Sequence, residues 1–572
     1  MLHTTAQADP AAEQCPASAV PSAWREHTFG DALEWACVRH GSREAIVWHE
    51  QRLSYAQFSA RVRAFARGLI ELGVERGEKV ALWMADRPEW LVARWAVPMI
   101  GAVLVPVNTR LRDRDVSYVL AQSDTATLIV QERSRAVSYF DILAAVDPGF
   151  RHHRADAWES SALPALRRAI GLTDNVLPPS MSAFEMVEAR GRALVDDGVL
   201  GARMREVASD DIAQILYTSG TTSFPKGAMV RHGALLQNNW YAGRCLDLGP
   251  SDRYLSCVPL FTATATFYSI AMLFAGGAIV IADGFEPQRF CQLVQAERIT
   301  VSFFVDTIVQ DLRAFPGLAQ YDLSSLRTGT GAPLPTASFL WLTNVLNIPQ
   351  LVSAYGMSET SNAVVRTRWD DPLEKRSRTN GRPVDGVRIR IADVETNATL
   401  PPGTIGEICV AGYVLMKGYY KLPEEDRRAF DSDGWLHTGD LGELDQDGYL
   451  IYRGRVKEMI KPGGFNVATQ EIEVFLKTFP GVREAVVVGV MDARLGEVGY
   501  AYVELAEGAQ VSGEALQGYC REHIASYKVP RYVEFVREWP MTGSQKIRKL
   551  ELKERAARRV GPGDRAQISA NA

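Results

Sequence analysis

The chain has 572 residues, of which 47% are hydrophobic and 23% are charged, fractions that are typical of a globular protein and exclude a disordered or fibrous one. Its 63 lysines and arginines against 68 aspartates and glutamates give a net charge of −5, which argues against bulk nucleic-acid binding, since that requires a basic surface. A small phosphate ligand stays compatible, because local geometry holds a small anion. At about 100–200 residues per domain, the length predicts three or four structural units.

The first 22 residues lack the basic start and apolar run of a signal peptide and are interpreted as a flexible tail. The longest apolar stretches, 95–107 and 268–282, fall short of the roughly 20 residues that cross a membrane, so we expect no membrane span. The seven cysteines are scattered and form no CxxC pair, which favours reduced core thiols over disulfides or a zinc site. Together these features indicate a cytoplasmic protein.

Strand and helix patterns alternate through the first two thirds of the chain, as expected for an α/β fold with right-handed crossovers and mainly parallel sheets. In chain order we predict a strand at 79–83, a helix at 89–100, strands at 102–106 and 278–282, a helix at 288–298, and strands at 300–304 and 324–328.

The pattern changes near residue 386. Short alternating runs at 387–394 and 406–410 flank a Leu-Pro-Pro-Gly turn and predict a small antiparallel β subdomain. After Gly454, predicted strands at 484–490, 499–505 and 532–536 surround predicted helices near 470–478 and 513–524. We expect a compact α+β domain of about a hundred residues there.

The segment YTSGTTSFPKG, residues 217–227, is the most informative one. Five hydroxyl side chains, two glycines and one lysine follow an apolar strand at 212–216. Backbone N–H groups, hydroxyl donors and a lysine charge together suit a polyphosphate. The segment is not a Walker A loop, because Lys226 precedes Gly227 instead of following a glycine. A flexible linker is the alternative, but a linker does not usually place Pro-Lys-Gly before an apolar strand.

Six blocks together resemble the adenylate-forming superfamily, which includes acyl-CoA synthetases, firefly luciferases and the adenylation domains of peptide synthetases. The block at 217–227 is similar to the phosphate-binding signature of that family. The other five are TGAPLP at 330–335, SAYGMSET at 353–360, GWLHTGD at 434–440, YRGRVKEMIKPGGFN at 452–466 and SYKVP at 526–530. The resemblance runs from Phe29 to Leu552, and six blocks in order at compatible spacing are a specific match.

The resemblance implies a binding site for ATP. Glu359 and Thr218 are expected to hold Mg²⁺ and to take part in catalysis, and Tyr355 offers a flat face to adenine. Asp440 can accept hydrogen bonds from both ribose hydroxyls, and Arg455 is expected to reach the ribose and phosphate. Taken alone, each of these residues would be an ordinary surface or core residue. The predicted ATP- or AMP-binding residues are Thr218, Ser219, Gly220, Thr221, Thr222, Lys226, Gly331, Ala332, Pro333, Tyr355, Gly356, Ser358, Asp440 and Arg455.

The resemblance also implies a mobile C-terminal domain. It divides the chain into a tail (1–22), an N-terminal adenylation domain (23–456) and a C-terminal lid domain (457–572), with Lys457 as the hinge. Lys546 matches the catalytic lysine, although Gln545 precedes it where the family usually has glycine. The alternative for Lys546 is a solvated basic helix face. Gly463 and Gly464 are expected to line the passage for the pantetheine arm of coenzyme A.

Two departures concern the acid-binding side. The family's acyl-CoA synthetases commonly carry a histidine in a PLFH-like segment, where this chain has PLFTATAT at 259–266. Asp306 stands where a proline is usual, so it either faces a polar substrate group or caps the helix that follows. Both sites suggest an acid other than a plain fatty acid. The predicted acyl pocket contains Phe261, Thr262, Thr266, Asp306, Thr330 and Gly331.

These features predict an AMP-forming carboxylic acid–CoA ligase that uses ATP, Mg²⁺ and coenzyme A on a small carboxylic acid. One alternative within the superfamily passes the acyl group to a carrier-protein thiol or an amine, and a luciferase-like oxidation is a further one. An alternative of another class is a catalytically silent nucleotide-binding regulator. The presence of Lys546, Glu359 and Asp440 argues against the silent protein.

Overall fold

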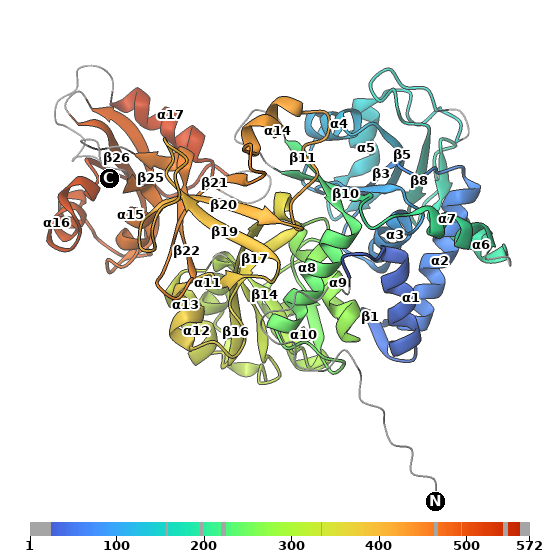
Figure 1. Ribbon diagram of the computed structural model, residues 1–572, viewed down its shortest axis with the longest axis horizontal. Helices are drawn as coiled ribbons and strands as arrows, with labels where there is room; N and C mark the ends of the chain where they lie inside the picture. The colour runs from blue at the N-terminus through green and yellow to red at the C-terminus, as the bar shows by residue number, and fades with distance from the viewer. Residues whose placement is uncertain are drawn as a thin grey trace, which may run out of the picture.

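The computed structural model describes residues 24–155, 158–194, 198–218, 225–332, 334–460, 462, 467–492, 495–541 and 547–560. Two large sheets with helices around them form the body of the molecule, and a smaller α+β unit follows near the C-terminal end (Figure 1). The α/β fold with a small antiparallel β subdomain and a separate C-terminal unit confirms the predicted fold class.

The first large sheet has nine strands in the order β18-β17-β16-β15-β14-β12-β13-β1-β2. Its six central strands pair in parallel, whereas β2, β17 and β18 join antiparallel at the two edges. The strands span β1 Glu44–Trp48, β2 Gln51–Ser54, β12 Arg253–Ser256, β13 Ala278–Ile281, β14 Val301–Phe304, β15 Thr328–Gly331, β16 Gln350–Met357, β17 Asn362–Arg366 and β18 Arg382–Pro383.

The second large sheet has seven strands in the order β11-β10-β4-β3-β5-β8-β9, and only the β10–β11 pair is antiparallel. The strands span β3 Lys79–Trp83, β4 Val103–Pro106, β5 Thr125–Gln131, β8 Arg168–Leu172, β9 Met181–Ala183, β10 Ile212–Thr218 and β11 Lys226–Arg231. A short hairpin, β6 Arg133–Ser134 and β7 Val137–Ser138, lies outside both sheets.

Helices cover these sheets and share one large core with them. All twelve residues of α3 are buried, so this helix is enclosed by the core. The helices of the body are α1 Phe29–His40, α2 Tyr55–Glu71, α3 Pro88–Met99, α4 Asp113–Gln122, α5 Tyr139–Val146, α6 Phe184–Ala193, α7 Gly198–Glu206, α8 His232–Cys245, α9 Ala263–Ala275, α10 Pro287–Glu297, α11 Asp306–Ala314, α12 Thr336–Asn344, α13 Leu373–Arg378 and α14 Pro423–Ala429.

The predicted antiparallel subdomain is a four-stranded sheet of consecutive strands, β19 Val387–Ala392, β20 Gly406–Gly412, β21 Leu436–Leu444 and β22 Leu450–Arg455. Each strand pairs antiparallel with the next. The short strands β23 Met459–Ile460 and β24 Val467–Ala468 follow it and lead into the C-terminal unit.

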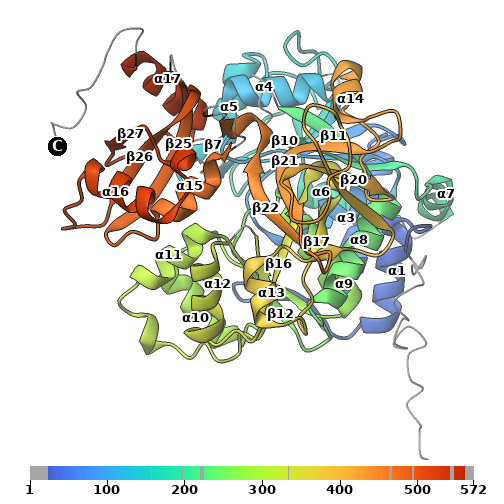
Figure 2. The same cartoon turned by 60° about the vertical axis from the view of Figure 1, so that its left-hand side comes forward.

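The C-terminal unit packs helices on both faces of a three-stranded sheet (Figure 2). The sheet contains β25 Val482–Asp492, β26 Gly496–Leu505 and β27 Tyr532–Phe535. Val487 and Ala501 pack with α15 Thr469–Leu476 and α16 Gly513–His523, whereas the neighbouring residues Val488 and Tyr502 pack with α17 Lys549–Arg559. Side chains of a strand alternate between faces, so these buried runs are covered on both sides.

One predicted strand is displaced. The run at 324–328 was expected to be a strand, but Leu326 N–H donates to Leu323 O in a turn, and β15 begins only at Thr328. The strand consists of Thr-Gly-Thr-Gly, which has little hydrophobic patterning, and parallel pairing with β14 and β16 determines it.

Two other expectations agree with the structure. All six described cysteines are free and five of them are buried. Among the described residues, we find no helix whose length and hydrophobicity would let it cross a membrane.

Candidate active site

The ends of β10 and β11 flank the predicted phosphate-binding segment. Thr218 is the last residue of β10 and pairs with Lys226, the first residue of β11. The hairpin therefore fixes both ends of the segment next to each other. The predicted residues Ser219, Gly220, Thr221 and Thr222 lie between them, outside the described residues.

Glu359 lies in a short 3₁₀ turn, Ser358–Thr360, that follows β16. Its side chain is buried, and Oε1 lies 3.4 Å from the Thr218 hydroxyl and accepts a hydrogen bond from the Tyr419 hydroxyl at 2.9 Å. Burial raises the pKa of Glu359. Within the described part of the chain this carboxylate has no ion pair, and oxygen ligands of this kind suit a divalent cation. Tyr419 was not predicted, because nothing in its local sequence links it to residue 359.

Lys226 points toward a carboxylate in the structure. Its ammonium group forms an ion pair with Glu425 of α14 and lies 5.2 Å from the centre of the Tyr419 ring. In Figure 1 α14 lies beside β11, far along the sequence from it. A triphosphate at this place would compete with Glu425 for the lysine. Motif spacing could not reveal Glu425 as a partner of Lys226.

The residues predicted to hold adenosine come together from two sheets. The Tyr355 hydroxyl donates to Asp440 Oδ2 at 2.8 Å, and Arg455 Nε lies 3.4 Å from Asp440 Oδ1. Asp440 and Arg455 are cross-strand partners in β21 and β22, and Tyr452 stacks on Tyr355 with ring centres 5.8 Å apart. The cluster therefore presents an aromatic face beside a carboxylate and a guanidinium.

Gly356 permits close packing at the end of β16. A Cβ atom there would lie 2.3 Å from the Cα of Ala363 in β17, so no larger residue fits without moving the strand. Ser358 begins the turn that carries Glu359. In the YGMSET block, Tyr355 therefore precedes the tight contact between β16 and β17, and Glu359 follows it.

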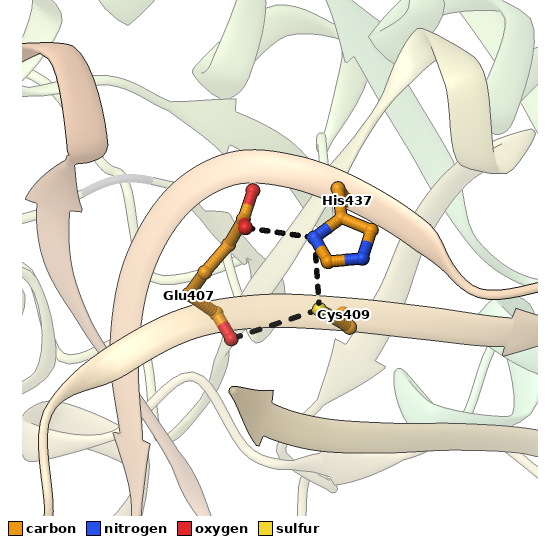
Figure 3. Close-up of side chains that lie close together, drawn as sticks. All are labelled: Glu407, Cys409 and His437. Atoms are coloured by element: carbon orange, nitrogen blue, oxygen red, sulfur yellow. Dashed lines mark hydrogen bonds and ion pairs between the residues drawn. The ribbon is translucent and has the colours of Figure 1, made fainter. Parts of the chain in front are cut away.

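A partly buried cluster on β20 and β21 (Figure 3) fixes the Thr-Gly-Asp turn, the irregular stretch of β21 at residues 438–440 that carries Asp440. Glu407 accepts hydrogen bonds from His437 Nδ1 at 2.8 Å and from the Gly439 N–H at 2.9 Å. Thr438 donates to Ile408 O at 2.7 Å. Gly439 has φ of 71°, a conformation that favours glycine. These bonds attach the Thr-Gly-Asp turn to β20.

Cys409 completes this cluster, with its sulfur 3.6 Å from His437 Nδ1. The ligand-capable atoms of Glu407, Cys409 and His437 all lie within 4.8 Å of one another. Burial and the nearby Glu407 carboxylate raise the pKa of the Cys409 thiol to about 12, so the sulfur is protonated at neutral pH. His437 already bonds Glu407, and we therefore interpret the cluster as a support for the turn.

Replacing Glu407 by alanine is expected to raise the KM for ATP about fivefold and to change kcat by less than about twofold, because one buried acceptor of the turn is lost. Steady-state kinetics at varied ATP concentration measure both values. Glu424→Ala is the matched control, since Glu424 is exposed and, among the described residues, pairs with Arg427 on its own helix. An unchanged KM in Glu407→Ala would show that β20 does not position the turn.

Acid is expected to weaken ATP binding through Asp440. Burial raises the pKa of Asp440 to about 6, so its carboxylate becomes protonated below that pH and loses acceptor capacity. At pH 5 about one tenth of the sites are ionised, and the KM for ATP should be about tenfold higher than at pH 7. Asp440→Asn cannot titrate at this position, so its KM for ATP should change with pH only as far as ATP itself titrates. The same pH dependence of KM in both proteins would contradict the role of Asp440.

The predicted acyl-pocket residues lie around the start of α9 and the end of β15. Thr262 caps α9 by accepting a hydrogen bond from the Ala265 N–H at 3.3 Å. Thr330 Oγ1 accepts a hydrogen bond from the Tyr268 hydroxyl at 3.2 Å. The Thr266 hydroxyl is buried without a hydrogen-bond partner among the described residues. Phe261 packs against the same core, as does Ala332, which follows Gly331.

Asp306 has partners within the protein. It accepts a hydrogen bond from the Ser338 hydroxyl of α12 at 2.5 Å and from Gln310 Nε2 at 3.4 Å. The expectation that it caps a helix is wrong in detail, because it is the first residue of α11 and Val305 is the cap. Its carboxylate instead joins α11 to α12, which accounts for a carboxylate at this position without a substrate group.

Lys457 lies in the turn Val456–Glu458 between β22 and β23. The next residue, Glu458, pairs at 2.6 Å with Lys549 of α17, which also pairs with Glu473 of α15 at 2.9 Å. A bridge between Met541 and Ile547 joins the two ends of the segment that contains Lys546. Lys546 itself, Gly463, Gly464 and Pro333 lie outside the described residues.

Comparison with known proteins identifies the family. The model of the AMP-binding enzymes matches residues 33–420, and the model of their C-terminal domain matches residues 471–546. The chain belongs to the AMP-binding enzyme family. Lys457 falls between the two matched ranges of this AMP-binding enzyme, and Thr218, Glu359 and Tyr355 fall within the first.

Named relatives of this AMP-binding enzyme include acyl-CoA ligases. It is 36% identical to a putative acyl-CoA synthetase of Bacillus subtilis, over 92% of this chain and 97% of the relative. It is 30% identical to the human mitochondrial medium-chain acyl-CoA ligase ACSF2, over 93% of this chain and 88% of the relative. Among solved structures, an anthranilate CoA ligase bound to anthranoyl-AMP has a TM-score of 0.81 at 25% identity, with 93% and 97% of the two chains covered.

Proposed function

We propose that this protein is an AMP-forming carboxylic acid–CoA ligase. The observation that carries the proposal is that three parts of the chain that are distant in sequence lie together, with the residue types that would bind a nucleotide. Thr218 lies beside the buried Glu359 carboxylate, and Tyr355, in the strand just before Glu359, bonds Asp440 of another sheet. Family membership and named acyl-CoA synthetase relatives support the same chemistry.

The reaction has two steps. A carboxylate oxygen of the acid attacks the α-phosphorus of ATP, and the bond to pyrophosphate breaks, which gives an acyl adenylate. The thiol of coenzyme A then attacks the acyl carbon, and AMP leaves with the carboxylate oxygen. The protein contributes mainly orientation and charge neutralisation, because phosphoryl transfer needs little covalent help.

The residues divide these tasks. Asp440 and Arg455 hold the ribose side of the nucleotide, with Tyr355 against adenine, and Lys226 exchanges Glu425 for a phosphate. Glu359 and Thr218 would hold Mg²⁺, which neutralises charge on the triphosphate when bound. A buried carboxylate beside a hydroxyl fits that ion.

The lid arrangement belongs to the same proposal. Residues 23–456 form the adenylation domain and residues 457–572 the lid, which turns about Lys457 between the two steps. This rotation of the lid withdraws Lys546 after adenylation and brings Gly463 and Gly464 to the path of the pantetheine arm. A hinge needs only a few residues that absorb a large backbone change, and a three-residue turn such as Val456–Glu458 provides them.

The acceptor is the finer part of the proposal. Medium-chain acyl-CoA ligases among the relatives favour coenzyme A. One similar structure, at 27% identity and a TM-score of 0.77, is an amide bond synthetase from Marinactinospora thermotolerans, which keeps an amine acceptor as the second candidate. A carrier-protein thiol is chemically equivalent to coenzyme A.

Acid-dependent exchange of pyrophosphate into ATP tests the first step with a panel of carboxylic acids. We expect exchange with at least one acid class, and thioester formation when coenzyme A is added. Exchange followed by amide formation with amines, but no thioester, would replace the ligase by the amide-forming candidate. No exchange with any acid would overturn the proposal and favour a silent nucleotide-binding protein.

A further inference from the structure

Arg366, the last residue of β17, is a buried cation without a counter-charge among the described residues. Only 3% of the residue is exposed, and Nε, Nη1 and Nη2 all lack hydrogen-bond partners among the described residues. Arg366 forms no ion pair with any described residue. Arginine stays charged in proteins, and buried charges are normally paired. Arg366 therefore has five N–H donors that no described residue accepts.

The position of Arg366 follows from contacts along α9. Asn362, at the start of β17, donates to Ala263 O at the start of α9 at 3.1 Å. The Arg366 guanidinium carbon lies 4.6 Å from the ring centre of Phe267, four residues further along α9. Four helical residues rise about 6 Å, so the guanidinium lies one turn deeper along the helix than Asn362.

The surrounding residues adjoin the predicted acyl pocket. Phe267 and Tyr268 directly follow Thr266, and the Tyr268 hydroxyl bonds Thr330 of β15. On the other strand, Arg366 pairs with Ala354, whereas Asn362 pairs with Met357 at the Glu359 end. Four strand residues span about 13 Å. Arg366 thus lies about 13 Å along β17 from the Glu359 end, opposite the residue that precedes Tyr355.

Burial lowers the pKa of Arg366, and the ionisable groups with the largest effects on it carry no negative charge at neutral pH. They are Cys245, Tyr268, Tyr241 and Tyr413. Burial raises the pKa of Cys245 to about 11 and raises the pKa values of the three tyrosines further above their ordinary range. A ligand anion would supply the missing charge.

Arg94 on α3 is a second fully buried arginine whose guanidinium nitrogens have no described partner. It lies 4.9 Å from the centre of the Phe29 ring, within the helical core. Burial without a partner is therefore not sufficient evidence for a ligand. The position of Arg366 against Phe267, adjoining the predicted pocket, is what distinguishes it.

We propose that Arg366 binds a second carboxylate at the far end of the substrate, so that the acid is a dicarboxylic acid with an apolar middle. Guanidinium and carboxylate match in charge and can form two parallel hydrogen bonds. Phe267 and Phe261 supply apolar surface between the two ends. This inference rests on the proposed function, because only adenylation places the first carboxylate at the nucleotide end.

Pyrophosphate exchange with the full-length protein tests the inference. The acids are dicarboxylates from butanedioate to dodecanedioate, octanoate as the monocarboxylate control, and 7-oxooctanoate as the neutral control. We expect the best dicarboxylate to exceed octanoate in kcat/KM at least tenfold. Arg366→Met should lower kcat/KM for that dicarboxylate about 10- to 100-fold and leave octanoate unchanged or improved, since a charge-assisted contact is lost. Arg366→Lys should retain part of the preference.

The outcomes separate the two proposals. No exchange with any acid overturns the proposed function itself. Preference for octanoate in the wild type, with no response to Arg366→Met, overturns the second carboxylate while adenylation stands. If 7-oxooctanoate is as active as the dicarboxylate, and Arg366→Met loses activity with both acids equally, a neutral acceptor suffices. That result also overturns the second carboxylate. Binding without turnover is measured as the rise in Tm on adding the dicarboxylate. We expect this rise in the wild type and no rise in a folded Arg366→Met variant.

Discussion

Replacing Lys546 by alanine is expected to slow adenylation about 100- to 1,000-fold, because the variant loses the cation that neutralises charge developing between the carboxylate and the α-phosphate. Thioester formation from a supplied acyl adenylate and coenzyme A should stay within about threefold of the wild type, since the proposed lid rotation would withdraw the lysine before that step. Pyrophosphate exchange measures the first half-reaction, and thioester formation measures the second.

Lys553→Ala is the matched control for this experiment. Lys553 lies on α17, and its half-exposed ammonium group pairs with Glu497 at 2.8 Å. Both half-reactions should be unchanged in the control. An equal loss of both half-reactions in Lys546→Ala would contradict the two-conformation account, and two unchanged half-reactions would show that Lys546 is part of a solvated basic surface.

Glu359→Gln is expected to lower kcat for adenylation about 100-fold and to raise the Mg²⁺ concentration for half-maximal rate at least about tenfold. The substitution keeps the shape and an oxygen that can accept from Tyr419 but removes the charge that would attract the cation. Rates at varied Mg²⁺ concentration measure both effects.

Tyr419→Phe separates the charge of Glu359 from its hydrogen bond. This variant loses the 2.9 Å contact but keeps the carboxylate, so its Mg²⁺ dependence should shift less than about threefold. If Glu359→Gln showed the wild-type Mg²⁺ dependence, the metal role of Glu359 would be wrong.

Much of the fold follows from local sequence. The strand at 79–83 has the predicted bounds, and the helix predicted at 89–100 is observed as α3 within one residue at each end. Apolar runs of this kind determine their own conformation. The run at 324–328 does not, since the observed strand begins at Thr328 and depends on pairing with its neighbours.

The site was predictable where one motif contains several of its residues. Tyr355 and Glu359 come from one block, and Asp440 from another that ends in a turn, so their types and spacing indicate nucleotide chemistry. Tyr419, Glu425 and Glu407 were missed because their contacts join residues at least 30 positions apart. A tertiary contact of that kind has no signal in a single sequence.

Arg366 shows the same limit in a different way. In the sequence it is one arginine after an apolar pair, Val364 and Val365, and a salt bridge at a strand end is the ordinary expectation. Only the structure shows that it is enclosed and unpaired beside Phe267. Likewise, the net charge of −5 argued against bulk nucleic-acid binding but left a small anion compatible, and Lys226 and Arg455 supply positive charge locally.

The central claim is that the protein makes an acyl adenylate and passes its acyl group to coenzyme A. Single-turnover reactions with ATP labelled at the α-phosphate measure this directly. With an accepted acid and no coenzyme A, we expect label in an enzyme-bound acyl adenylate. Adding coenzyme A should convert it to AMP and acyl-CoA in equal amounts. Formation of ADP, or an adenylate that does not decay when coenzyme A is added, would contradict the account.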